Sequence, residues 1–110
     1  MAWYKIVDKD KNGDYRALFH GVSGSRFLPP GAMIESEQKI VSDGTNGTKY
    51  TSGWHVMNNL DECKEYMSKF TATDRERVIV EVGVYGRVWP KKHSPSNVYL
   101  CETIKILREV

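Results

Sequence analysis

The chain has 110 residues, which is the length of one domain and is enough for a hydrophobic core without disulfide or metal staples. Apolar residues make up 40% of it, which excludes a disordered chain, and the net charge of +2 is too small to indicate a nucleic-acid or membrane partner. The lack of CxxC spacing, of an apolar signal core and of any run of transmembrane length predicts a single soluble cytoplasmic domain over 1–110, with Cys63 and Cys101 as free thiols.

The N-terminal segment predicts a β-hairpin. Residues 3–8 are rich in β-prone side chains and roughly alternate between apolar and polar. Asn12-Gly13 is a strong turn signal, and residues 15–22 alternate again. We therefore expect strands at 3–8 and 15–22.

The middle of the chain predicts two loops around one ambiguous element. Pro29-Pro30-Gly31 excludes a helix or a central strand from the loop 23–31. Residues 33–41 fit either a short edge strand, which could pair with another chain, or a helical turn. Residues 42–49 form a second loop that is polar and rich in glycine.

The stretch YTSGWHVM, residues 50–57, is predicted to be extended. Successive side chains of a regular strand point to opposite faces. Trp54 and His55 then cannot both face the core, so one of them faces solvent or a cleft.

One helix is predicted, at about 60–70. Asn59 is its expected N-cap, and Glu62 stands three residues later, as in a capping box. Apolar residues recur at helical spacing from Leu60 to Phe70.

Two long strands are predicted at the C-terminal end. In 77–89, the alternation places five valines on one face and leaves the opposite face, with Ile79, half exposed. Residues 98–110 form the last strand. The sum is an α+β fold with a mostly antiparallel sheet of five or six strands and one principal helix.

Glu102 interrupts an apolar row in the last predicted strand. A carboxylate in such a row is unfavourable to bury unless it is paired. One interpretation is a β-bulge or a register that turns Glu102 outward. The other is a functional carboxylate in a cleft.

The histidines predict no metal site. His20 and His55 each lie between apolar residues, and nothing in the sequence places a third ligand near them. A hydrogen-bonded structural role is the simpler interpretation of each.

Residues 18–21, Leu-Phe-His-Gly, resemble the L-Y-H-G strand that opens ADP-ribosyltransferases and the related RNA 2′-phosphotransferases. A strand with Tyr50, a helix, a Val-rich strand and a strand with Glu102 follow in the order of those families. The resemblance implies an enzyme that binds NAD in a cleft between split sheets. His20 would hold the nicotinamide ribose, Tyr50 would stack on the nicotinamide ring and Glu102 would orient the nucleophile.

Gly53-Trp54-His55 before a short helix is similar to a stretch in small uncharacterised phage and prophage proteins. That resemblance implies a compact accessory protein of phage or mobile-element origin. The chain lacks a complete catalytic set, so we predict a non-catalytic protein that binds a host protein or a nucleotide-like small molecule without a cofactor. The NAD-dependent enzyme is the alternative. The expected binding residues are Tyr50, Ser52, Trp54, His55, Arg87 and Trp89.

Overall fold

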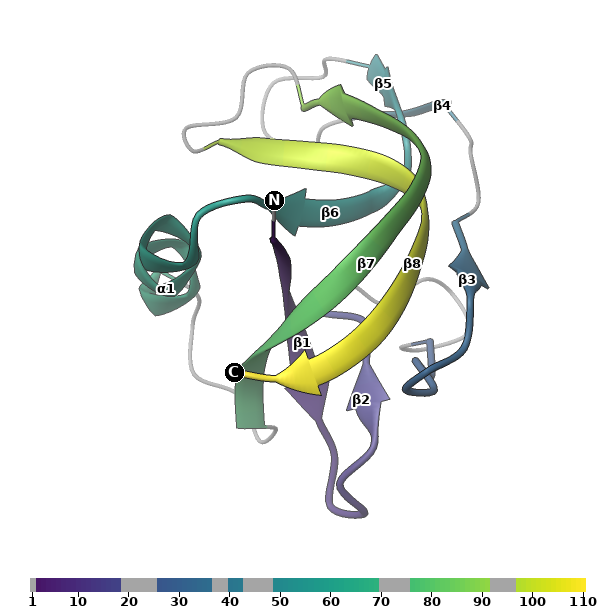
Figure 1. The fold of residues 1–110 in the computed structure, drawn as a ribbon. Helices are drawn as coiled ribbons and strands as arrows, with labels where there is room; N and C mark the ends of the chain where they lie inside the picture. The colour runs from purple at the N-terminus through teal and green to yellow at the C-terminus, as the bar shows by residue number, and fades with distance from the viewer. Residues whose placement is uncertain (1, 19–25, 37–39, 43–48, 70–75, 92–96) are drawn as a thin grey trace.

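The computed structural model describes residues 2–18, 26–36, 40–42, 49–69, 76–91 and 97–110. Within these ranges, a six-stranded antiparallel sheet curls into a partial barrel, one helix packs against it and two short strands pair separately (Figure 1). The predicted α+β class and its sheet are therefore confirmed. The elements are β1 (Trp3–Lys9), β2 (Tyr15–Arg16), β3 (Ile34–Glu35), β4 (Ile40–Ser42), β5 (Lys49–Thr51), β6 (Trp54–Met57), α1 (Leu60–Ser68), β7 (Glu76–Pro90) and β8 (Val98–Glu109).

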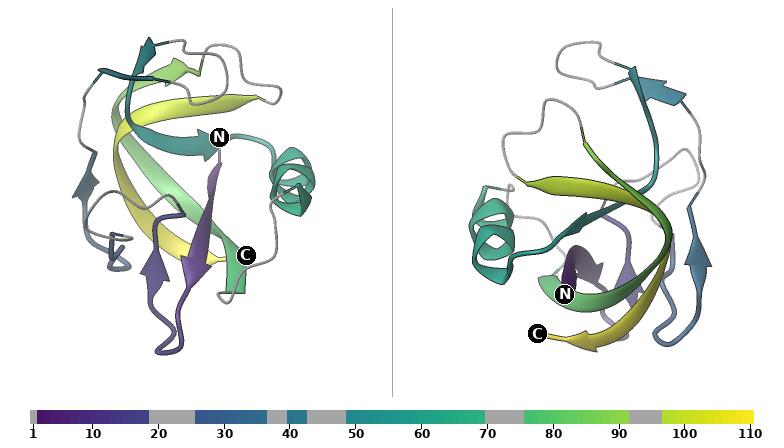
Figure 2. Two further views of the ribbon diagram at one scale, coloured as in Figure 1. Left: turned by 180° about the vertical axis from the view of Figure 1, so that it is seen from behind. Right: turned by 45° about the horizontal axis from the view of Figure 1, so that its top comes forward.

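Four strands close a ring. β1 pairs with β7, β7 with β8, β8 with β6, and β6 returns to β1. The closing contact is the weakest, because β1 and β6 share only the pair Tyr4↔Met57, whereas the β1–β7 ladder runs from Trp3↔Val82 to Lys9↔Glu76. Figure 2 shows the long strands β7 and β8 arching together around this ring.

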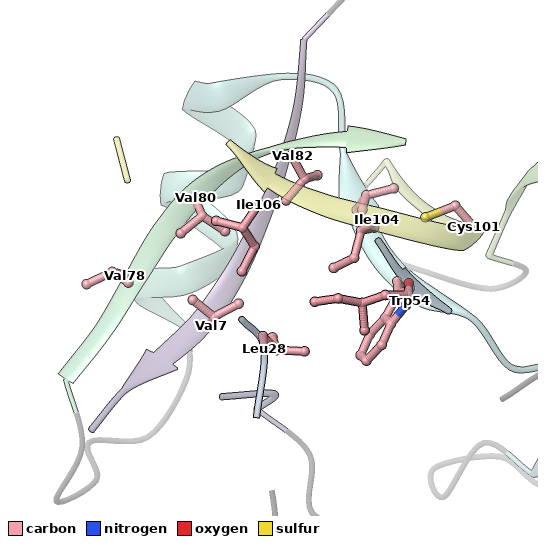
Figure 3. Packing of buried hydrophobic residues seen from close by; sticks show 11 residues of the cluster. Val7, Leu28, Trp54, Val78, Val80, Val82, Cys101, Ile104 and Ile106 are labelled. Carbon is pink, nitrogen blue, oxygen red and sulfur yellow. Dashed lines mark hydrogen bonds between the residues drawn. The ribbon is translucent and has the colours of Figure 1, made fainter. Parts of the chain in front are cut away.

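The ring encloses the main core. Alternate residues of β1, β7 and β8 point inward and meet Trp54 of β6 and Leu28 (Figure 3). The predicted inward face of 77–89 is confirmed for Val78, Val80 and Val82, which are all buried. The members of this core are Val7, Leu28, Ile34, Trp54, Val56, Val78, Val80, Val82, Cys101, Ile104 and Ile106.

Helix α1 covers a second, smaller core. The side chain of Asn59 accepts a hydrogen bond from the Glu62 backbone N–H at 3.0 Å, so the predicted N-cap is confirmed. The apolar stripe of the helix packs on Ile6, Met57, Ile79 and Val98. Ile79 is therefore buried, and the prediction that its face is half exposed is wrong at this position because the helix covers it.

The N-terminal hairpin is real but shorter than predicted. β1 and β2 pair antiparallel, and Gly13 in the turn has φ +83°, which glycine adopts without strain. Strand β2 ends at Arg16, because the neighbouring backbone groups bond to residues 26–28 instead of to β1. The Ala17 N–H donates to the Arg26 carbonyl, and the Leu28 N–H donates to the Tyr15 carbonyl. The predicted strand at 15–22 is wrong at 17–18, and 19–22 lies outside the described residues.

The middle of the chain forms short strands that belong to two different sheets. In the described part of 33–41, β3 pairs with β8, and β4, which continues to Ser42, begins at Ile40 and pairs with β5. The extended stretch 50–57 breaks at Ser52-Gly53, so its first part joins the separate two-stranded sheet and its second part joins the barrel. The segment 50–57, predicted as one extended stretch, therefore contributes strands to two sheets.

A β-bulge interrupts the pairing of β7 with β8. The register shifts between Tyr85 and Val88, and Gly86 has φ +80°. Past this shift Val88 is 39% exposed, so its predicted place on the inward face is wrong. Opposite the bulge, Glu102 turns outward, as the first interpretation of this residue required.

The two cysteines, Cys63 and Cys101, are both buried and free. Burial raises the pKa of each thiol to about 11, so both stay protonated at neutral pH. In the described part of the chain, no helix has the length and apolarity needed to span a lipid bilayer.

Candidate binding pocket

A pocket lies at the seam where β1 and β6 separate. Beyond Tyr4↔Met57 no further pair joins the two strands, and α1 packs against both of them. The cavity that remains has a volume of about 200 Å³. We call it the seam pocket, and the described residues that line it are Tyr4, Lys5, Ile6, Ala17, Leu18, Gly53, Trp54, His55, Met57, Cys63, Tyr66, Lys91 and Val98.

The lining of the seam pocket is mostly apolar. Ile6, Trp54, Met57 and Val98 in this lining are buried. Tyr66 and Gly53, which also line the pocket, are half-buried. A mostly apolar cavity with a few polar groups is the usual form of a small-molecule site.

Lys5 is the unusual residue of this pocket. It is 7% exposed, and its Nζ donates a hydrogen bond to the His55 carbonyl oxygen at 3.0 Å, across the seam where a ladder bond is missing. The Trp54 ring lies 5.3 Å from Nζ, within the range of a cation–π contact. Burial lowers the pKa of Lys5 from 10.5 to about 8.

Among the described lining residues, the charged ones are lysines only. Lys5 and Lys91 are cations, and no aspartate or glutamate lines the pocket in the described ranges. Burial, and then the proximity of Lys5 and Lys91, lowers the pKa of His55 to about 3, so the imidazole is neutral at pH 7. A positive pocket of this kind favours a neutral or anionic guest over a cationic one.

Trp54 is held rigidly in the wall between pocket and core. Its indole N–H donates to the Ile34 carbonyl at 2.9 Å, and the Arg26 guanidinium lies 5.1 Å from its ring. Next to it, Gly53 leaves no room for a side chain. A Cβ there would stand 2.8 Å from the Cys101 carbonyl oxygen and 3.2 Å from the Trp89 ring. Glycine is thus required for β6 to approach β8 this closely.

A second cluster lies beyond the bulge, on the outside of the barrel. The Arg87 Nε donates to the Glu102 carboxylate, and the guanidinium lies 5.6 Å from the Trp89 ring. The Arg87 side chain is 74% exposed and that of Glu102 is 27% exposed. The Arg87 guanidinium lowers the pKa of Glu102, chiefly through this hydrogen bond. We call these three residues, with Thr51 and Val88, the Arg87 patch.

The structure divides the residues predicted from sequence between these two places. Trp54 and His55 line the seam pocket, whereas Arg87, Trp89 and Glu102 belong to the Arg87 patch. The half-buried Ser52 precedes Gly53 in the connection between the two sheets. Tyr50 lies in β5, but its side chain is outside the description, and His20 is outside the described residues altogether. The convergence of His20, Tyr50 and Glu102 stays a prediction.

Sequence reasoning missed Lys5. The signal was present, because Lys5 alternates with Trp3 and Val7 and so places a cation on the inward face of β1. Glu102 is the corresponding charged residue in an apolar row of the last strand. The helical spacing from Leu60 to Phe70 predicts an apolar face, but only the fold shows that Cys63 and Tyr66 on this face also line a cavity.

The described residues hold no group of three or more His, Cys, Asp or Glu side chains placed to bind a metal ion. Comparison of the chain with protein-family models, with curated proteins and with solved structures finds no match, so any functional inference depends on the geometry described above.

Proposed function

We propose that the protein is a non-catalytic binding protein that holds a small, largely apolar molecule in the seam pocket. The observation that carries this proposal is Lys5, a buried amine that faces an apolar cavity with no carboxylate in its described lining. A buried charge without an opposite charge destabilises a fold. Residues kept at such a disadvantage are typical of functional sites.

The size of the cavity limits the guest. An apolar cavity of about 150 Å³ holds benzene in another protein. The seam pocket, at about 200 Å³, therefore fits one aromatic ring or a short alkyl chain with a small polar head. The head would lie near Lys5 or Lys91, where N–H groups can donate to an oxygen.

A thermal-shift experiment with three matched ligands tests the proposal. Benzyl alcohol, benzoate and benzylammonium share one ring and differ in charge. At a Kd of about 1 mM, 10 mM ligand stabilises the native state by about 1.4 kcal/mol and raises the melting temperature by several degrees. We expect a rise with benzyl alcohol and with benzoate, and none with benzylammonium.

Two leucine substitutions, one inside the pocket and one outside it, test whether the ligands bind in the seam pocket. Ala17→Leu adds bulk to the pocket lining, whereas Ala32→Leu adds the same bulk outside it. The rise should disappear in Ala17→Leu and persist in Ala32→Leu. The proposal fails if none of the three ligands raises the melting temperature of the wild type, or if Ala17→Leu responds as the wild type does.

A further inference from the structure

Lys5 and Lys9 stand on the same strand in opposite environments. Lys9 Nζ lies 3.1 Å from the Glu109 carboxylate, and this ion pair is partly exposed. Lys5 is buried, faces the seam pocket and has a backbone carbonyl and an indole ring as its described neighbours. The two amines therefore differ in their access to an apolar guest and in their protonation.

We propose that the Lys5 amine captures a small aldehyde with an apolar body as an imine inside the seam pocket. This inference deepens the proposed function and rests on it, because the aldehyde must first occupy the pocket. It names the chemical class of the guest, a carbonyl compound about the size of one aromatic ring.

The hydrogen bond to His55 suits this chemistry. A neutral amine carries two N–H bonds and one lone pair. One N–H can keep donating to the His55 carbonyl oxygen at 3.0 Å, which holds the nitrogen at the pocket wall while the lone pair is free. A lysine desolvated in an apolar pocket is an established form of activated nucleophile.

The step balances without a further reactant. The nitrogen lone pair attacks the carbonyl carbon, and the nitrogen loses a proton while the oxygen gains one, which gives a carbinolamine. The carbinolamine then expels its hydroxyl group with the remaining nitrogen proton as water, and a C=N bond forms. The net change is amine plus aldehyde to imine plus water, and no oxidant or reductant takes part.

Protonation favours Lys5 over Lys9, the other amine compared on this strand. Its pKa is lowered by burial to about 8, whereas the hydrogen bond to Glu109 raises the pKa of Lys9. At pH 7 roughly a tenth of an amine with pKa 8 is neutral, against less than a thousandth of an ordinary lysine. The thiol of Cys63 in the same pocket does not compete, since burial keeps it protonated.

Reductive trapping tests the inference. The folded protein is treated at pH 7 with benzaldehyde and cyanoborohydride, which reduces the imine to a stable benzylamine, and each lysine is quantified by peptide mass spectrometry. We expect Lys5 to be labelled at least ten times faster than Lys9 and Lys64. Unfolding the chain in urea should abolish the preference, because it removes the pocket.

Three variants make the test specific. Lys5→Arg keeps the cation and a hydrogen-bond donor but cannot form the imine, and its melting curve is to be recorded to establish whether it folds. Lys9→Arg, the matched control on β1, should leave labelling of Lys5 unchanged. Ala17→Leu, which narrows the pocket, should slow labelling of Lys5 while leaving Lys9 unaffected.

Benzyl alcohol separates the two proposals, because it fits the pocket but cannot form an imine. If it raises the melting temperature while Lys5 is labelled no faster than Lys9, the imine inference is overturned and the binding function stands. If none of the three ring ligands raises the melting temperature and Lys5 shows no preference, both proposals fall. Preferential labelling of Lys5 that benzyl alcohol suppresses supports both.

Discussion

Two of the tryptophan–cation contacts among the described residues differ in almost every respect except their distance. Lys5 lies 5.3 Å from the Trp54 ring inside the seam, and Arg87 lies 5.6 Å from the Trp89 ring outside the barrel. Arg87 has the Glu102 carboxylate beside it and water around it. Lys5 has a backbone carbonyl and is 7% exposed.

This contrast shows why the seam pocket, rather than the Arg87 patch, carries the functional proposal. An exposed ion pair that is solvated on several sides contributes little to stability and is common on protein surfaces. A buried amine with no carboxylate among its described neighbours opposes folding, so its presence demands another explanation. The two cations lie at similar distances from a tryptophan ring, but only the buried one imposes a cost on the folded state.

The largest expected difference between the two regions concerns the tryptophans themselves. Trp54→Ala should lower the free energy of unfolding by about 3–5 kcal/mol, because the ring is buried in the main core and anchored to Ile34. Trp89→Ala should have a clearly smaller effect, since its ring keeps part of its surface in water. Urea unfolding of both variants measures the difference. Equal losses would mean that the two rings are not separated by depth as described.

The next comparison replaces each cation by methionine. Lys5→Met should raise the free energy of unfolding at pH 7 by about 1–3 kcal/mol, because removing the buried charge outweighs the lost hydrogen bond. Arg87→Met should cause no measurable change.

The pH dependence of the free energy of unfolding tests whether the effect of Lys5→Met comes from the buried charge. Below pH 8 both states of the wild type carry the Lys5 proton, and the native state bears the full penalty of burial. Between pH 8 and 10.5 the unfolded chain still holds a proton that the native state has released, so the native state gains stability as the pH rises. The advantage of Lys5→Met should therefore shrink over this window in urea titrations at pH 7 and 9.5. A constant advantage would contradict the role given to burial.

The smallest expected effect is a loss of stability at mildly acidic pH that depends on His55. The folded-state pKa of His55 lies near 3 and its ordinary value is 6.5, so below pH 6.5 the unfolded chain binds a proton that the native state does not. The wild type should lose about 1–2 kcal/mol of stability between pH 7 and 5. His55→Gln should lose less over the same interval, in matched urea titrations.

In the Arg87 patch, the stability contribution of Glu102 is lost in a more acidic pH range than that of His55. The pKa of Glu102 is lowered from 4.5, so its contribution to stability is present above that value and is lost at more acidic pH. Glu102→Gln should therefore follow the wild type from pH 7 to 5. Parallel loss in the wild type and in His55→Gln would show that the imidazole is not held neutral by burial.

Local signals predicted some elements closely. The helix follows from Asn59, Glu62 and the apolar period, all of which act within a few residues. The turn at Gly13 has the positive φ that Asn-Gly predicts. The alternation of valines placed most of β7 correctly as far as the bulge.

Other features could not be read locally. The short β2, the break at Gly53 and the outward turn of Glu102 all depend on which distant segment supplies a hydrogen-bond partner or a bulge. Alternation gives the face of a side chain but not what covers that face. For this reason alternation predicts a half-exposed Ile79, although helix α1 buries it.

The class of fold, the helix and the two long strands follow from local patterns in the sequence, which also places a tryptophan and a histidine directly after Gly53. The position of Lys5, which reaches across a seam closed by one residue pair and faces a cavity under the helix, follows only from the folded arrangement of the strands. The physical reason is that periodicity is local, whereas burial of a charge depends on how a curved sheet closes on itself.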